Sequence, residues 1–550
     1  MKNVFLGLLS FAFLGLNAQN TVGLLSVKPN SVQDGYTLIY PHNQSNVYLI
    51  DNCGEIAHVW TDNQYVPGNS AEISQDGKLY RAIRENTSTQ HFHFVGGAGE
   101  GFEIKDWNNN VLWRWFYSDS LVRAHHDFTV MPNGNILAIA WEKLDSLQAI
   151  AEGRDPNFMA HPELWPEQIV EIEPIGTDSA KIVWKWRSID HVVQDYDSTK
   201  ANFGVISQNP HKINLNYGSP KDDWLHSNAI DYNPGLDQIV ISVPTFNEIW
   251  VIDHSTTTSQ AASSTGGLAG KGGDLLYRWG NPEAYGRGDS TDQMLYYQHD
   301  IHWADLELDN SDPDFNKFVV FNNRVMNAYS HPGIFAPVFD TYDWEYPMNG
   351  NTWGPSNFDY EFVHPDTALT FSTGLSSAQK LPNGNMLMVA GRTGYIYEVA
   401  PNGTLVFEYR TPLTGGNPVA QGTQLQSNAN LTFKAKKYTA SYPAFAGKDL
   451  SGKGFIELNP DTSYCQNFLS AEILEQSHFN LYPNPGNGRL NLETEANTFS
   501  LEIWNTNGQV IRRTENQRQI DISDLPNGMY ILRYQDAQTI ESRTYIKSNL

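Results

Sequence analysis

The stretch SSAQKLPNGNMLMVAGRTGYIYEVAPNGTLVFEY, residues 376–409, contains two successive β-hairpin patterns. In each one, an alternating run leads into a Pro-Asn-Gly turn and a second, more apolar run follows it. Alternating runs separated by such turns are typical of antiparallel strands. The two hairpins together therefore predict one four-stranded sheet.

The same two hairpin types recur along the chain. Segments similar to 376–391 are AEISQDGKLYRAI (71–83), HHDFTVMPNGNILAIA (125–140) and HSNAIDYNPGLDQIVISV (226–243). Segments similar to 395–409 are VYLIDNCGEIAHVW (47–60), FEIKDWNNNVLWRW (102–115) and VEIEPIGTDSAKIVWKW (170–186). Repeated four-stranded sheets are the units of a β-propeller. We count about five pairs and expect a sixth sheet built from both chain ends, with GFIELNP (454–460) as its closing strand.

The sequence thus predicts an all-β chain with a six-bladed β-propeller over residues 22–470. An unrelated sandwich or barrel remains an alternative, because the spacing between repeats is irregular. The net charge of −25 argues against a nucleic-acid binder and against adsorption to anionic membranes, since the sequence has no basic stripe that would release counterions.

The first residues, 1–18, have the pattern of a signal peptide: a lysine, a short apolar run and small residues at the end. We therefore expect export through the periplasm to the medium or the outer cell surface, and no integral membrane segment. The two cysteines, Cys53 and Cys465, form either a disulfide that joins the ends of the main body or two buried thiols.

Three histidines occupy one repeat position. His126 lies eight residues before its turn glycine, His226 lies nine before its own, and His299 begins a unit with a longer turn. Equivalent positions on different blades meet around the channel, so these residues are candidates for catalysis or for a three-histidine metal site. His302 lies three residues after His299, and the side-chain period of two predicts that it packs between blades instead.

Beyond residue 478 the pattern changes to short alternating strands with tight turns, which predicts a separate Ig-like β-sandwich over 478–550. With its Pro-Asn-Pro motif at 483–485 and the turn LPNGMY (525–530), this part resembles the C-terminal sorting domain of Bacteroidetes type IX secretion cargo. The resemblance implies that the secretion machinery is a partner. A generic adhesive module is the alternative.

Four segments resemble the bacterial arylsulfate sulfotransferases, six-bladed propellers that act without the nucleotide donor PAPS. They are HHDFTVMPNGNIL (125–137), DWLHSNAIDYNP (223–234), YQHDIHW (297–303) and SSAQKLPNGNML (376–387). The resemblance implies a ping-pong transfer of a sulfuryl group from an aryl sulfate to a phenolic acceptor through a sulfohistidine.

By motif position the nucleophile is His299, with His226 and His126 as further catalytic residues and His125 as a substrate contact. A neutral imidazole suits this chemistry at pH 7. Neither a metal nor an organic cofactor is expected.

One position departs from the family pattern, because Pro244 stands where the family carries an arginine. Arg392 is our first candidate replacement and Arg324 the second; Asn228 and Asn322 are candidate neutral donors to substrate. The departure leaves two alternatives open. One is an inactive propeller that binds sulfated aromatics or glycans at the cell surface, and the other is a metal-dependent hydrolase.

Overall fold

The computed structural model describes residues 20–85, 92–93, 96–97, 99–304, 307–463, 465, 479–484, 486–494, 496–505, 509–536 and 540–548. The predicted signal peptide lies outside them. The chain divides into two compact units, Met1–Tyr464 and Cys465–Leu550.

The prediction of an all-β chain is confirmed. Within the described ranges the α-helices are single short segments: α1 (Ser146–Ala151), α2 (Thr258–Ala261) and α3 (Thr367–Thr370). Five 3₁₀ turns accompany them, at Pro156–Phe158, Ser188–His191, Ile206–Gln208, Pro282–Tyr285 and Pro443–Phe445. None of the described helices has the length and apolarity needed to cross a membrane.

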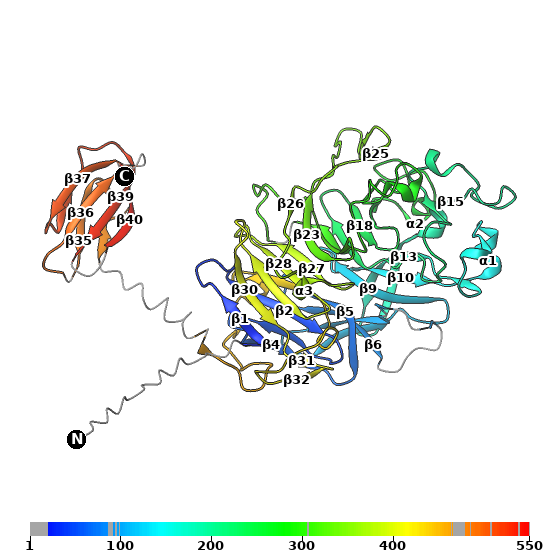
Figure 1. The fold of residues 1–550 in the computed structure, drawn as a ribbon, viewed down its shortest axis with the longest axis horizontal. Helices are drawn as coiled ribbons and strands as arrows, with labels where there is room; N and C mark the ends of the chain where they lie inside the picture. The colour runs from blue at the N-terminus through cyan, green and yellow to red at the C-terminus, as the bar shows by residue number, and fades with distance from the viewer. Residues whose placement is uncertain are drawn as a thin grey trace, which may run out of the picture. The chain divides into compact units, whose positions relative to one another are not determined.

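Six antiparallel sheets of four or five strands make up the first unit (Figure 1). They are named here by their strands in hydrogen-bonding order. The first three are β5 (Tyr65–Ile73), β6 (Leu79–Glu85), β7 (Gly101–Lys105) and β8 (Val111–Phe116); then β9 (Val122–Val130), β10 (Ile136–Glu142), β13 (Glu167–Ile175) and β14 (Ser179–Arg187); then β17 (Ala229–Asn233), β18 (Gln238–Val243), β19 (Glu248–Asp253) and β20 (Tyr277–Trp279).

The other three sheets complete the unit. They are β21 (His299–Trp303), β22 (Phe318–Val325), β23 (Tyr329–Phe335) and β26 (Tyr360–Glu361); then β27 (Ser377–Lys380), β28 (Met386–Ala390), β29 (Tyr395–Val399), β30 (Leu405–Arg410) and β1 (Gly23–Val27); then β33 (Thr432–Thr439), β2 (Gly35–Pro41), β3 (Val47–Ile50) and β4 (Ile56–Trp60). Two-residue strands β11 (Leu144–Asp145), β12 (Glu163–Leu164), β15 (Val192–Val193), β16 (Ile213–Asn214), β24 (Met348–Asn349), β25 (Thr352–Trp353), β31 (Leu413–Thr414) and β32 (Asn417–Pro418) form small ladders in the connections.

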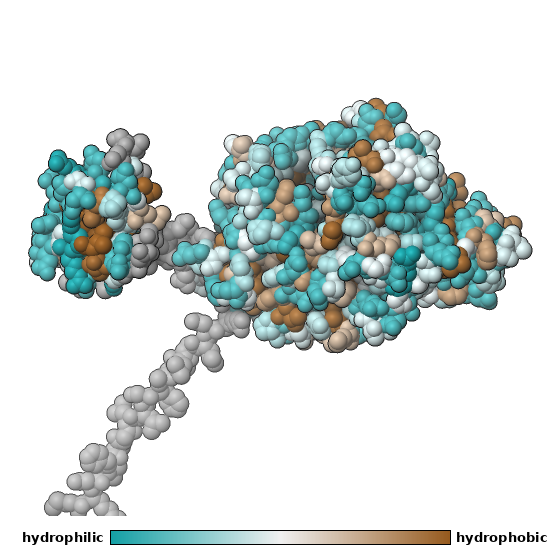
Figure 2. All heavy atoms as spheres, turned by 90° about the horizontal axis from the view of Figure 1, so that it is seen from above, coloured by the Kyte–Doolittle hydropathy of each residue, from teal (hydrophilic) through white to brown (hydrophobic). Residues whose placement is uncertain are grey.

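The first strand of each sheet contacts the next sheet in a closed circle. β5 contacts β9, β9 contacts β17, β17 contacts β21, β21 contacts β27, β27 contacts β33, and β33 contacts β5 again. Apolar clusters fill the spaces between neighbouring sheets; one of them joins residues of β10 and β13 to residues of β18 and β19. The face drawn in Figure 2 is mostly hydrophilic, with scattered apolar patches.

The sixth sheet does combine segments from both ends of the first unit, but the predicted closing strand is wrong. Thr432–Thr439 pairs with β2, whereas 454–460 contributes only isolated contacts, including a bridge between Glu55 and Phe455. The sequence TFKAKKYT of this strand has three lysines, which is unusual for an inner strand. Two of them are paired with acids: Lys434 with Asp127, and Lys437 with Glu398. Paired charges allow burial of lysines that a hydrophobic pattern cannot anticipate.

The second unit contains two further sheets. Their strands are β34 (Asn480–Tyr482), β35 (Arg489–Glu493) and β38 (Gln519–Asp521) in one, and β37 (Val510–Glu515), β36 (Ser500–Trp504), β39 (Gly528–Gln535) and β40 (Ile540–Lys547) in the other. Alternating residues from both sheets form its own apolar core, which includes Leu490, Leu501, Ile520 and Leu532.

Candidate active site

The three predicted histidines lie together. His126 is in β9, His226 precedes β17 and His299 begins β21, so they come from three neighbouring sheets. The rings of His126 and His226 are 4.6 Å apart between centroids. Phe433 of β33 lies 6.2 Å from His126 and 6.3 Å from His299. Sequence positions 126, 226 and 299 therefore form one cluster around an aromatic ring.

The backbone at these positions is strained. His126 and His226 have φ values of +50° and +53°, and Asp300, next to His299, has +57°. A non-glycine residue in this region costs on the order of 1–3 kcal/mol, and such residues concentrate at functional sites. In β21 the irregularity is a break in register between His299 and His302.

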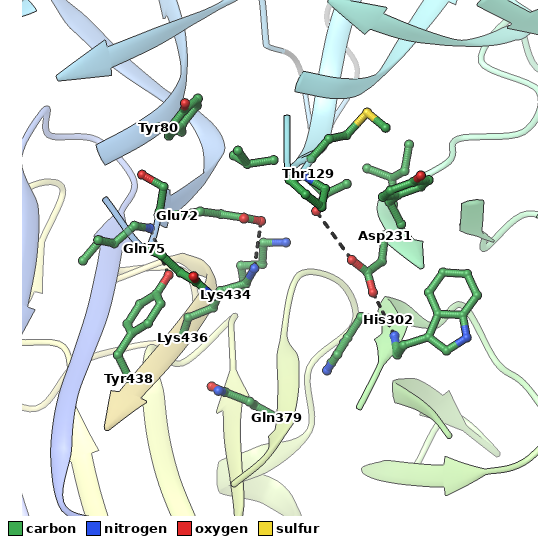
Figure 3. Close-up of a pocket in the computed structure, with 18 of the residues that line it drawn as sticks. Glu72, Gln75, Tyr80, Thr129, Asp231, His302, Gln379, Lys434, Lys436 and Tyr438 are labelled. Atoms are coloured by element: carbon green, nitrogen blue, oxygen red, sulfur yellow. Dashed lines mark hydrogen bonds and ion pairs between the residues drawn. The ribbon is translucent and has the colours of Figure 1, made fainter. Parts of the chain in front are cut away.

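That break changes the position of His302. Its ring does not pack between sheets, as the strict period of two predicted, but lines a pocket of about 630 Å³ (Figure 3). The Nδ1–H of His302 donates to the Asp300 carbonyl oxygen at 2.9 Å. The pocket also contains Lys434 and Lys436 of β33, and Figure 3 shows both near Glu72.

His299 is held in one tautomer. Its Nδ1–H donates to the Oδ1 atom of Asn323 at 2.8 Å, and its Nε2 accepts the Leu375 backbone N–H at 3.0 Å. Burial lowers the pKa of His299 to about 3, because the charged form is poorly solvated. The ring is therefore neutral at pH 7, with the lone pair on Nε2.

His226 has the opposite electrostatic environment. Its Nδ1–H donates to a carboxylate oxygen of Asp223, whose other oxygen accepts the Trp141 indole N–H at 2.9 Å. Burial by itself lowers the pKa of His226, but the charge and hydrogen bond of Asp223 outweigh it and raise the pKa above its ordinary value. Among the described residues, no group bonds to His226 Nε2, so a proton there is available to a ligand.

His126 ends a buried chain of hydrogen bonds. Its Nδ1 lies 2.8 Å from Nδ1 of His125, and the Nε2 of His125 lies 2.7 Å from a carboxyl oxygen of Glu167. The other Glu167 oxygen accepts the Ser227 backbone N–H. Burial and the nearby Asp223 raise the pKa of Glu167 well above its usual range, and burial lowers that of His126. One proton on this chain decides whether His126 Nε2 donates or accepts.

His125 itself is a supporting residue in this geometry. It stacks on Trp141 with ring centroids 4.0 Å apart and an interplanar angle of 10°. Both of its ring nitrogens have protein partners.

Two arginines lie beside Tyr297, whose ring is near both His226 and His299. The guanidinium of Arg324 lies 3.6 Å from the ring centroid of Tyr297. Arg392 interacts electrostatically with both Arg324 and Tyr297, and burial lowers its pKa. The charge of Arg324 also acts on His299, where it helps to lower the pKa of the imidazole.

The predicted asparagine donors have protein partners. Asn228 donates to the Gln298 carbonyl, and its Oδ1 is buried without a hydrogen bond among the described residues. The side-chain amide of Asn322 accepts the Tyr296 backbone N–H through Oδ1 and donates through Nδ2 to the Met294 carbonyl. The neighbouring Asn323 contacts His299 instead.

Sequence reasoning missed the residues that control the imidazoles: Asp223, Glu167, Asn323, Tyr297 and Phe433. Asp223 had a usable signal, because it lies three residues before His226. Glu167 and Asn323 lie 42 and 24 positions away from the histidines they contact, and no local pattern connects them. Both cysteines, Cys53 and Cys465, are disulfide-bonded, and the chain has no others.

Comparisons with solved structures give weak similarities. A protein of unknown function from Bacteroides caccae aligns at 10% identity with a TM-score of 0.36, covering 74% of this chain and 98% of that one. Virginiamycin B lyase from Staphylococcus aureus aligns at 11% identity and a TM-score of 0.32, covering 72% and 87%. The periplasmic gluconolactonase of Pseudomonas aeruginosa aligns at 9% identity with a TM-score of 0.33, covering 74% of this chain and 99% of that one. Identities and TM-scores this low support no conclusion about the fold or the activity of this chain. No curated protein matches the sequence significantly.

Two family models match the sequence. Residues 480–548 match the secretion system C-terminal sorting domain, which supports export and a secreted or cell-surface location. Residues 24–438 match the arylsulfotransferase (ASST) model, a range that includes all three clustered histidines. The chain therefore belongs to the arylsulfotransferase family and carries a type IX sorting domain.

Proposed function

We propose that this protein transfers a sulfuryl group from an aryl sulfate ester to a phenol by a ping-pong mechanism through a sulfohistidine at His299. The observation that carries the proposal is the pairing of a neutral His299 with a His226 whose pKa is raised. Environments that separate the pKa values of neighbouring groups assign the nucleophile and the acid.

In the first half-reaction, His299 Nε2 attacks sulfur and the bond from sulfur to the aryl oxygen breaks. His226 Nε2–H gives its proton to the leaving phenolate. In the second half-reaction, the acceptor phenol gives its proton to His226 while its oxygen attacks sulfur, and the N–S bond breaks. Both histidines return to their starting protonation states.

The peptide N–H of Leu375 supports this assignment. It donates to His299 Nε2 at 3.0 Å, at the position where the sulfuryl group would arrive. On formation of the N–S bond the same N–H is available to a sulfuryl oxygen, like the donors that stabilise oxyanions. His126 Nε2, when protonated, is a second donor.

Arg324 and Arg392 replace the arginine missing at Pro244 in this proposal. The guanidinium of Arg324 lies over the Tyr297 ring, and the charge of Arg392 acts on the same tyrosine. A planar guanidinium fork suits a sulfate group. Asn322 and His125 remain predicted substrate contacts of lower rank, because protein groups already use their polar atoms. Asn228 also remains a predicted substrate contact, and its amide nitrogen already donates to the Gln298 carbonyl.

For the whole chain, we propose that the circle of six sheets is a six-bladed β-propeller over residues 22–470. Residues 478–550 are then an Ig-like sandwich recognised by the type IX secretion machinery, after the signal peptide 1–18 has directed export to the periplasm. The closed order of contacts from β5 to β33 supports the first part.

The experiment is release of nitrophenolate from 4-nitrophenyl sulfate, with and without phenol, by the mature protein and by His299→Ala. We expect phenol-dependent release that is lost in the variant. Release that needs no acceptor and is abolished by EDTA would favour the metal-dependent hydrolase. Tight ester binding without release would favour the inactive binding propeller.

A further inference from the structure

A second group of polar side chains lies outside the histidine cluster. His93, His161 and Asp222 each offer one atom, and these three atoms lie within 4.8 Å of one another. From this arrangement we infer a binding site for one divalent transition-metal ion, held by two imidazoles and one carboxylate. The site is independent of the sulfuryl chemistry proposed above.

The spacing of the donor atoms suits a metal ion. His93 Nε2 lies 3.2 Å from Asp222 Oδ2, and His161 Nδ1 contacts the same oxygen. A tetrahedral ion with bonds of about 2.0–2.1 Å separates its ligand atoms by roughly 3.3 Å. A small outward movement of His161 is enough to admit the ion.

In Asp222 and His93, the polar atom that does not face the ion has a protein partner, and this partner orients the atom that does. Asp222 Oδ1 accepts the His161 backbone N–H at 3.0 Å, which leaves Oδ2 for the ion. His93 Nδ1 faces a Glu163 carboxylate oxygen at 3.6 Å. A carboxylate behind a histidine favours the Nδ1–H tautomer and directs the Nε2 lone pair to the metal.

The carboxylate of Asp222 is buried, and the charge of the buried Arg154 also acts on it. The Asp222 side chain is 2% exposed, and its ion pairs among the described residues are with the two imidazoles alone. His93 also packs on Trp165 with ring centroids 4.4 Å apart, so an apolar wall borders one side. The imidazoles are 43% and 59% exposed, which leaves access for the ion and for a water ligand.

The donor set selects the class of ion. Two neutral imidazoles and one carboxylate suit Zn²⁺ or Fe²⁺, whereas Mg²⁺ and Ca²⁺ prefer oxygen ligands. Three protein ligands leave one or more coordination positions open. No regular motif marks this site, because the ligands come from positions 93, 161 and 222.

The test uses the mature, chelator-treated protein. We would titrate it with Zn²⁺ by calorimetry and with Co²⁺ by absorption spectroscopy, which reports coordination number without any assay of activity. We expect one equivalent to bind, and His93→Ala and His161→Ala each to weaken binding by about 10-fold or more. His211→Ala, which removes a half-buried imidazole elsewhere, is the matched control and should bind like the parent.

His299→Ala separates this site from the histidine cluster. It should bind the ion normally while it abolishes sulfuryl transfer, so a failure of either proposal is visible by itself. Absence of binding, binding unaffected by both ligand variants, or binding lost in His299→Ala would each overturn the inference.

Discussion

At the scale of single residues, the site depends on the partners of its imidazoles more than on the imidazoles themselves. Three histidines at one repeat position could be found in the sequence, because the turn glycines align the repeats. Their protonation states could not, since these depend on buried groups such as Asn323, Asp223 and Glu167, which the fold brings from elsewhere.

Asp223→Asn should weaken the general acid. Without the Asp223 carboxylate the pKa of His226 falls. As pH rises, His226 therefore loses its proton at a lower pH in the variant, and activity declines at a lower pH than in the parent. With phenyl sulfate, a poor leaving group, we expect a decrease in kcat of about 10²-fold, and a smaller decrease with 4-nitrophenyl sulfate. The measurement is a pH–rate profile for both esters.

Trp141→Phe is the control for that variant, because it removes the indole donor to Asp223 but keeps the Asp223–His226 pair. An equal shift of the profile in both variants would assign Asp223 a packing role only.

Glu167→Gln should change how stability depends on pH. Burial raises the folded-state pKa of Glu167, so the folded protein holds this proton when the unfolded chain has released it. The parent therefore loses stability as pH rises above the unfolded value of about 4.3. The glutamine variant should lack this loss, as measured by urea unfolding at pH 5 and pH 8; identical pH dependence would contradict it.

At the scale of elements, β33 is where hydrophobic patterning failed. Lys434 and Lys437 of this strand are buried against acids of other sheets, and Lys434 lies between Asp127 at 2.8 Å and Asp300 at 3.8 Å. The turns at Pro382–Gly384 and Pro401–Gly403 followed local rules, whereas β21 departed from the period of two at its register break. The closing strand depended on charges supplied 307 residues away.

Lys434→Met should destabilise the sixth sheet by leaving two buried carboxylates without their cation. We expect a loss of about 3–5 kcal/mol at pH 8. Burial raises the pKa of Asp300 to about 7, so the loss should be smaller at pH 5, where that carboxyl is protonated. Urea unfolding at both values measures it.

Lys436→Met, in the same strand, is the comparison variant. Its lysine pairs with Glu72 at 2.8 Å and is more exposed, so a smaller effect is expected. Equal losses in the two variants, or no dependence on pH for Lys434→Met, would contradict this account of β33.

At the scale of the whole molecule, strands β2–β4 from the beginning of the first unit and β33 from near its end share one sheet, so closure of this unit requires Thr432–Thr439. A mature chain that ends after Cys465 should fold and retain sulfuryl transfer, because it keeps β33 and both cysteines. A chain that ends before Thr432 should lose cooperative thermal unfolding and activity. Activity in the shorter chain would disprove the need for closure.

The most direct test of the central claim is peptide mapping of the protein after incubation with 4-nitrophenyl sulfate in the absence of phenol. The account predicts a mass increase of one SO₃ group on the peptide that contains His299, which disappears when phenol is added. A sulfuryl group on His126 or His226, or none on any histidine while transfer proceeds, would contradict it.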